Sequence, residues 1–184
     1  MKIGIIDIET AGWLRENGVI VEIGIVSLDT ETGQIDPIFS STCREKHLRA
    51  KHRNAWIFKN SDLTVEEVRT APDLPEILPL VQEHIDALDA LTAFNKSFDF
   101  NFLRNRGLII EKEWPCAMRI AAPVCKIPYK NGKAGNKWPT VEEAWNHFFP
   151  GRPYIEAHRG FDDALHEAEI VYELHKLGLM EKTI

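Results

Sequence analysis

Two acidic side chains stand at the end of an apolar run near the start of the chain. Residues 3–12 read IGIIDIETAG, which places Asp7 and Glu9 two positions apart. Side chains alternate between the faces of a strand, so both acids are expected on the face that carries Ile3 and Ile5. Two carboxylates this close repel each other and are costly to desolvate unless a cation lies between them. Their oxygens suit Mg²⁺ or Mn²⁺, whereas the simpler alternative is that both acids point into water.

Three residues further along the chain could complete such a site. Asp99 lies in AFNKSFDFNFL, at the start of an expected helix, and His158 and Asp163 lie in AHRGFDDALHEA. His158 and Asp163 do not share one helix face, so the histidine is expected on a loop and Asp163 in the first turns of the following helix. The structural alternatives are that Asp99 and the Asp162–Asp163 pair complement helix dipoles and that His158 is a surface residue.

The elements that must position these residues alternate along the chain. Period-two patterns predict strands, and spacings of three and four residues with capping signals predict helices. The expected strands cover 2–8, 19–29, 34–43, 90–94 and 114–118, with a hairpin turn at 31–33. The expected helices cover 64–88, broken near Pro72, and 97–107, 139–149 and 162–177. A hairpin followed by alternating strands and helices predicts an α/β domain with a mixed sheet.

Composition limits the class of protein. The chain has 184 residues and a net charge of −6, and we expect a single domain over residues 1–184. No run of about 18 apolar residues is present, so no membrane span is expected. No secretory signal is visible, and the three cysteines are too few and scattered for a disulfide framework or a zinc site. We therefore expect a cytoplasmic protein.

Three segments together resemble the motifs of the DEDDh 3′→5′ exonucleases, the family that includes ribonuclease T, oligoribonuclease and the proofreading subunit of a bacterial replicative polymerase. The segments are IIDIETAG with Asp7 and Glu9, AFNKSFDFNFL with Asp99, and HRGFDDA with His158 and Asp163. The resemblance covers nearly the whole chain in the same order and spacing. It implies a ribonuclease H-like fold with a five-stranded mixed sheet flanked by helices.

The resemblance also implies roles for the five residues. Two divalent cations, Mg²⁺ or Mn²⁺, would be held by Asp7, Glu9, Asp99 and Asp163, with Asp7 bridging both. His158 would be the general base, and the product a 5′-mononucleotide released from a 3′ end. Histidine suits that role because imidazole titrates near neutral pH.

Substrate contacts are expected beside the first two motifs and on a basic segment. The expected contacts are Thr10, Ala11, Gly12, Trp13, Asn95, Phe98, Lys126, Lys130 and Lys133. Residues 126–137 read KIPYKNGKAGNK, with four lysines and no acid, and a second basic stretch covers 44–53. The family's usual Thr-Thr-Gly is Thr-Ala-Gly here, and its usual His-Gly-Ile is replaced at 60–63 by NSDL. The alternative for both basic stretches is a solvated surface.

Several alternatives stay open at this point. The sequence does not decide between DNA and RNA, with DNA slightly favoured, and single-stranded 3′ ends are expected over intact duplex. A proofreading subunit bound to a DNA polymerase, a catalytically silent nucleic-acid-binding module and a ribonuclease H-like endonuclease are rival interpretations. A homodimer is also open, because ribonuclease T-like and oligoribonuclease-like relatives dimerise.

Overall fold

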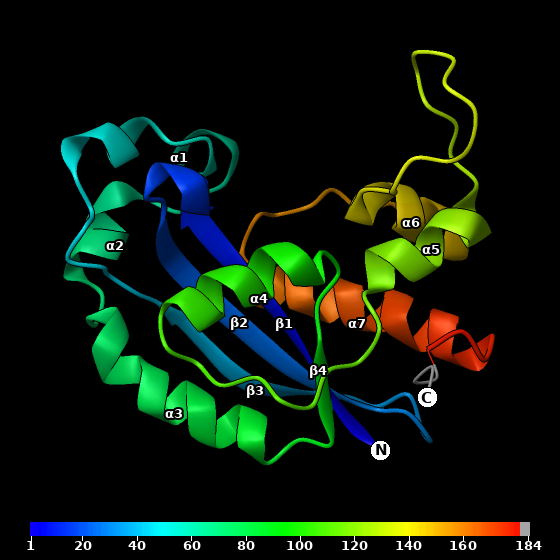
Figure 1. The fold of residues 1–184 in the computed structure, drawn as a ribbon, viewed down its shortest axis with the longest axis horizontal. Coiled ribbons are helices and arrows are strands. Elements are labelled where there is room, and N and C mark those ends of the chain that lie inside the picture. The colour runs from blue at the N-terminus through cyan, green and yellow to red at the C-terminus, as the bar shows by residue number, and fades with distance from the viewer. Residues whose placement is uncertain (181–184) are drawn as a thin grey trace.

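The computed structural model describes residues 1–180 as one mixed sheet between two layers of helices (Figure 1). The strand order is β3-β2-β1-β4. The strands are β1 (Lys2–Ala11), β2 (Val19–Asp29), β3 (Ile35–Thr42) and β4 (Ala90–Thr92). β1 pairs antiparallel with β2 and parallel with β4, and β2 pairs antiparallel with β3. The first three strands and the break near Pro72 lie where the sequence predicts them.

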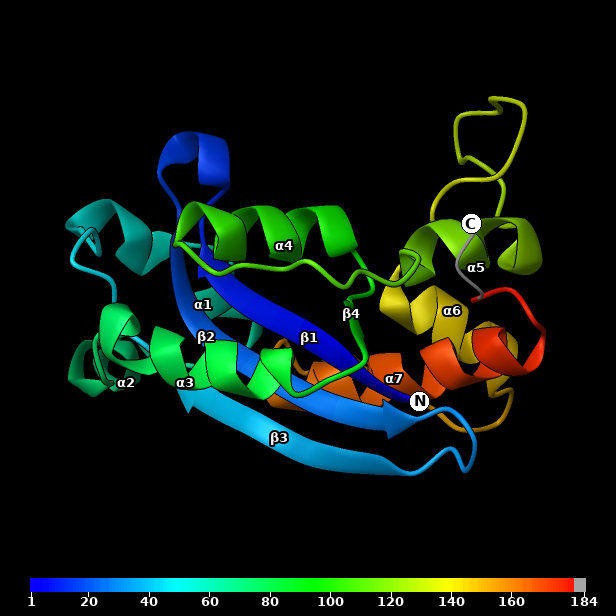
Figure 2. The same ribbon diagram turned by 60° about the horizontal axis from the view of Figure 1, so that its bottom comes forward.

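Helices cover both faces of the sheet, as Figure 2 shows from a second direction. The α-helices are α1 (Ile57–Asn60), α2 (Val65–Thr70), α3 (Leu74–Asp86), α4 (Lys96–Asn105), α5 (Ala117–Cys125), α6 (Val141–Phe148) and α7 (Gly160–Lys176). Two short 3₁₀ helices, η1 (Leu14–Glu16) and η2 (Ala50–Asn54), lie in connections. Among residues 1–180, no helix is both long and apolar enough to cross a bilayer.

The alternation of β1 divides the core into two parts. Ile3 and Ile5 pack with α7, α5 and α6 on one face, whereas Ile6 and Ile8 pack with α3 and α4 on the other. Burying these isoleucines on both faces explains why β1 reads as an almost continuous apolar run. The alternation therefore assigns Asp7 and Glu9 to the α7 face, the face of Ile3 and Ile5.

The predicted fifth strand at 114–118 is wrong. Within the described residues, its backbone pairing with β4 is limited to Leu91, whose N–H donates to Lys112 O at 2.7 Å and whose carbonyl accepts from Trp114 N at 2.8 Å. The Thr92 hydroxyl adds one side-chain bond, to Pro115 O at 2.8 Å. Pro115 follows and has no N–H to continue a ladder. Cys116 then caps α5, so the segment turns into a helix and the sheet has four strands.

The length of β4 determines where the sheet edge is open. β4 pairs only with Ile3, Gly4 and Ile5 of β1. The second half of β1 runs beyond β4. The strand continues to Ala11 rather than ending at residue 8 as the sequence predicted, so both Asp7 and Glu9 lie inside it. A register irregularity follows at Glu9/Thr10. This edge of β1, which β4 leaves unpaired, is where α4 and the start of α7 bring their side chains.

Candidate active site

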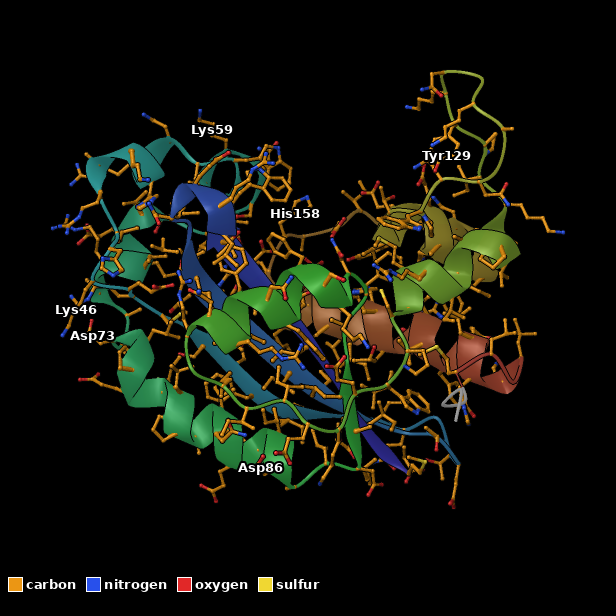
Figure 3. All side chains as sticks on the ribbon, in the orientation of Figure 1. Lys46, Lys59, Asp73, Asp86, Tyr129 and His158 are labelled. Carbon is orange, nitrogen blue, oxygen red and sulfur yellow. The ribbon has the colours of Figure 1, made fainter. Side chains whose placement is uncertain are left out.

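The five predicted site residues converge on the open half of β1. Asp7 and Glu9 come from β1, Asp99 from the first turn of α4 and Asp163 from the first turn of α7. His158 lies on the loop before α7. In Figure 3 its side chain lies between α1, which carries Lys59, and the loop that carries Tyr129. Segments far apart in the sequence therefore meet at one position.

Asp163 is the most firmly held of the acids. It is buried, and the Tyr154 hydroxyl donates to its Oδ1 at 2.7 Å. The backbone N–H of Arg159 donates to its Oδ2 at 3.1 Å. Both oxygens therefore have a fixed donor, which sets the orientation of the carboxylate.

Asp99 is attached to the strand itself. Its Oδ1 accepts from the backbone N–H of Ile8 at 3.4 Å. That N–H lies on the β1 edge that the short β4 leaves unpaired. Asp99 thus supplies an acceptor where the sheet lacks one and brings its carboxylate into the same cluster as Asp7.

His158 has a left-handed backbone conformation, with φ of +54°. Its ring lies 4.5 Å from the Trp56 ring in an edge-to-face arrangement, and its Nδ1 lies 3.9 Å from Glu156 Oε1. Glu9, His158 and Asp163 each present one ligand atom within 4.8 Å of the others. The loop histidine and the helix aspartate therefore do face one site.

Burial raises the pKa values of the acids well above their ordinary range. The pKa of Glu9 is raised to about 9, mainly by burial, and the charges of neighbouring acids, Asp163 first, raise it further. The pKa of Asp99 is raised to about 8, again by burial. For Asp7 the pKa is raised by burial first and then by Glu167, Glu9, Asp99 and Asp163. Such a cluster is unfavourable as bare carboxylates and needs protons or cations.

The donor set fits divalent cations. Asp7 Oδ2 is shielded from solvent and has no hydrogen-bond partner among the described residues. The charged groups around Asp7 are other acids, which repel its carboxylate rather than compensate it. Buried polar atoms are almost always satisfied, so an orphaned carboxylate oxygen indicates a missing partner. Hard oxygen ligands from several carboxylates are what Mg²⁺ and Mn²⁺ prefer.

The structure adds residues that the sequence reasoning missed. Glu167 is buried one helical turn after Asp163, accepts from Phe94 N at 3.1 Å, and has its pKa raised well above normal by burial and then by Asp99. Because Glu167 follows Asp163 by four residues in a predicted helix, the sequence already indicated that both lie on the same helix face. Glu156 has its pKa raised to about 7 by burial first and then by Asp163. Neither Tyr154 nor Trp56 belonged to a recognisable pattern.

A cavity of about 400 Å³ opens beside Glu9. It is lined mainly by Glu9, Thr10, Gly12, Trp13, Trp56, Ile57 and Phe98. Trp13 and Trp56 are 57% and 58% exposed, and Trp13 contacts Phe98 edge-to-face at 5.7 Å. The cavity therefore combines aromatic surfaces with a carboxylate of the acidic cluster.

The remaining predicted contacts lie elsewhere. Ala11 is buried and packs with Val19 in a small core cluster, so its side chain is not offered to a ligand. Asn95 is the N-cap residue of α4, without a side-chain cap bond. Lys126, Lys130 and Lys133 do not line the cavity. They lie on the loop between α5 and α6, which projects from the body in Figure 1.

The RNase T exonuclease family model matches residues 5–171. The chain belongs to this exonuclease family. Over 167 residues this exonuclease-family chain is 27% identical to a DNA polymerase III of PolC type from Clostridium perfringens. That alignment covers 91% of this chain and 11% of the polymerase, so the chain spans about a tenth of that relative's length.

Solved structures of exonucleases share the fold. The nuclease domain of 3′hExo, a DEDDh family member bound to rAMP, matches all of this chain and 97% of its own, with a TM-score of 0.66 and 18% identity. E. coli exonuclease I in complex with a dT13 oligonucleotide matches over 94% of this chain and 40% of its own, with a TM-score of 0.72 and 13% identity. The predicted ribonuclease H-like class is therefore confirmed, with four strands in place of five.

Proposed function

We propose that the chain is a metal-dependent 3′→5′ exonuclease that releases 5′-mononucleotides from single-stranded nucleic acid. The observation that carries this proposal is that Glu9, Asp99 and Asp163 surround Asp7, with His158 beside Glu9 and Asp163, while Asp7 Oδ2 has no partner among residues 1–180. The membership of the exonuclease family and the DEDDh and exonuclease I neighbours support it.

Asp7, Glu9, Asp99 and Asp163 would hold two cations, Mg²⁺ or Mn²⁺. When bound, the cations supply positive charge that stabilises the attacking and leaving oxygens of the phosphodiester. His158 accepts a proton from the attacking water. The water oxygen bonds to phosphorus, the P–O3′ bond breaks, and the leaving O3′ oxygen takes a proton from solvent, so the shortened strand ends in a 3′-hydroxyl. Tyr154 and the Arg159 N–H hold Asp163 in place throughout.

The 3′-terminal nucleotide occupies the cavity beside Glu9. A volume of about 400 Å³ lies within the usual range for small-ligand sites, about 300–1,000 Å³. Exposed indole faces provide stacking surfaces for a nucleobase, and such stacking discriminates little between different bases. A terminal base must leave its stack to enter, which favours single-stranded ends over intact duplex, whereas nothing in the cavity distinguishes DNA from RNA.

The lysine loop would contact the strand farther from its 3′ end. Lys126, Lys130 and Lys133 lie outside the cavity, on the projecting loop, and the exonuclease must hold a polyanion despite a net charge of −6. Phosphate contacts by lysine require no base recognition. The basic loop would thus bind the phosphates of the strand, which the acidic cluster alone would repel.

Proofreading in association with a DNA polymerase is a second candidate function. The 27% identity to a PolC-type DNA polymerase III favours it. A proofreading role would show as higher activity on a mismatched primer end when a DNA polymerase is present. A cytoplasmic location and a homodimer stay predictions.

The test uses 5′-labelled single-stranded DNA and RNA of matched sequence with Mg²⁺, Mn²⁺ or EDTA. A ladder that shortens from the 3′ end, appears with metal and is absent in EDTA is expected. Internal cuts would favour an endonuclease. Binding without cleavage under every metal condition would favour the silent nucleic-acid-binding module.

A further inference from the structure

Arg159, the residue after His158, has an unusually complete set of acidic partners. Its side chain is 27% exposed, and its guanidinium donates to Glu22 from Nε at 3.0 Å and from Nη2 at 2.9 Å. Nη1 donates to Asp62 at 2.8 Å, and Nη2 also donates to Glu67 at 3.1 Å. All three nitrogens are therefore engaged by carboxylates from β2, the loop before α2, and α2 itself.

The backbone beside Arg159 is fixed to the same strand. Gly160 N donates to Glu22 Oε2 at 3.1 Å, and Glu22 is buried. A Cβ placed on Gly24 would lie 2.2 Å from the backbone of Gly160. The start of α7 thus lies directly on β2, at a distance that only glycine allows. Glu22 holds both the side chain of Arg159 and the next peptide.

His158 needs such an anchor because of its backbone conformation. A non-glycine residue with φ of +54° is strained and persists only where its surroundings hold it. On one side its ring contacts Trp56 at 4.5 Å, and on the other the chain is fixed by Arg159 and Gly160. We infer that Arg159 is a positioning residue that holds the His158 backbone in its strained conformation by clamping the loop to β2 and α2.

This inference rests on the proposed function, because it assigns Arg159 a role through the general base. A direct role on substrate phosphate does not fit, since each guanidinium nitrogen already donates to a carboxylate. Arg152 offers a matched control. It lies on the same connecting loop and makes a two-pronged ion pair with Glu169 of α7, at 2.8 and 3.2 Å. Among the described residues, its guanidinium otherwise lies over the rings of Trp145 and Phe149.

The test compares R159Q, R159K and E67Q with R152Q. Displacing a catalytic group by about 1 Å costs on the order of 10²-fold in rate. We expect R159Q to lower kcat about 10- to 100-fold while KM and the Mg²⁺ concentration for half-maximal activity change less than about 3-fold. R159K and E67Q, which keep part of the clamp, should fall between R159Q and the unaltered protein. R152Q should lower Tm without lowering kcat.

The same substitutions in an H158A background separate positioning from general stability. If Arg159 acts through His158, R159Q should cost less than about 3-fold in kcat once His158 is absent. An equal cost in both backgrounds, or an unchanged kcat in R159Q, would overturn the inference. A large rise in the Mg²⁺ requirement would also overturn it, because it would place the effect on Asp163.

A readout that needs no activity keeps this test independent of the proposed function. The ring protons of His158, assigned in NMR spectra by their loss in H158A, should be displaced by the ring current of Trp56. We expect R159Q, but not R152Q, to move these signals toward their random-coil positions. If the His158 signals do not move in R159Q, the positioning role of Arg159 is rejected, even if the protein cleaves no substrate. If they move in a protein that proves inactive, the positioning role stands while the proposed function fails.

Discussion

The Tyr154 hydroxyl donates a 2.7 Å hydrogen bond to Asp163 Oδ1. The Tyr154 ring is itself fixed, because it stacks on His166 at 4.0 Å and lies 5.1 Å from Trp145. Asp163 therefore has an outer partner with a rigid position, whereas Asp7 Oδ2 has no partner among residues 1–180. This contrast indicates that Asp163 is oriented before any cation arrives.

Y154F should weaken cation binding without changing the ligand set. Loss of the hydroxyl frees Asp163 to rotate, and outer partners of metal ligands are typically worth about 10- to 100-fold in affinity or activity. We expect the Mg²⁺ concentration for half-maximal activity to rise by about that factor. Tyr172, another α7-face tyrosine that packs against the core rather than on Asp163, provides the control Y172F. An unchanged Mg²⁺ requirement in Y154F would leave the hydrogen bond without a role in metal binding.

Neighbouring acids on α7 allow a matched comparison of D163N with D162N. Asp163 is buried in the site, whereas Asp162 has its side chain 46% exposed and lies 3.5 Å from His166. We expect D163N to lower exonuclease activity at least about 10³-fold, because the cations lose a ligand on which charge stabilisation depends. D162N should retain activity within about 3-fold, as surface changes usually do. Equal losses in both variants would contradict the site.

The sequence predicted the parts of this site that follow from local pattern. Alternation along β1 gave the shared face of Asp7 and Glu9, and helix spacing gave the loop position of His158. The anchor of Asp99 on Ile8 N could not be predicted, because it depends on how short β4 is. The missing fifth strand has a similar cause, since Pro115 and the start of α5 end the pairing after Trp114.

Contacts between distant segments were also beyond sequence reasoning. Trp56 and His158 lie about a hundred residues apart, and no periodicity connects them. The same is true of Arg159 and Glu22, whose ion pair forms only because Gly24 lets α7 approach β2. Motif residues were thus recoverable from the sequence, whereas the residues that hold them were not.

Stability of the metal-free protein should fall as pH rises. Glu9 has its pKa raised from 4.5 to about 9, and Asp99 from 3.8 to about 8. The folded state therefore binds more protons than the unfolded state between about pH 4 and pH 9, and stability declines through that window. Thermal melts in EDTA should show a falling Tm from pH 5 to pH 9. Mg²⁺ should raise Tm most at the upper end, and a Tm that rises with pH in EDTA would contradict the cluster.

Trp13 should contribute to binding of the terminal base. Trp13 is 57% exposed, lines the cavity beside Glu9 and contacts Phe98. Base stacking on an aromatic side chain is worth about 1–3 kcal/mol, so W13A should raise KM about 5- to 150-fold. An oligonucleotide with an abasic 3′-terminal nucleotide is the control, because W13A should then change KM little. An equal effect on both substrates would mean that Trp13 does not stack on that base.

The lysine loop between α5 and α6 should account for much of the salt dependence of binding. Lys130 is on its exposed part, and Lys133 Nζ lies 5.0 Å from the Tyr129 ring, without a carboxylate partner among the described residues. Replacing both with glutamate removes two phosphate contacts and adds repulsion, so K130E/K133E should raise KM about 10-fold or more at low salt. The slope of log KM against log salt concentration should become shallower by about 1.4, since each phosphate contact to a single strand contributes about 0.7. Lys176, in the last turn of α7 and paired with Glu173, provides the control K176E. If the loop variant and K176E show the same KM and the same slope, the loop is a solvated surface and the strand leaves the site along another path.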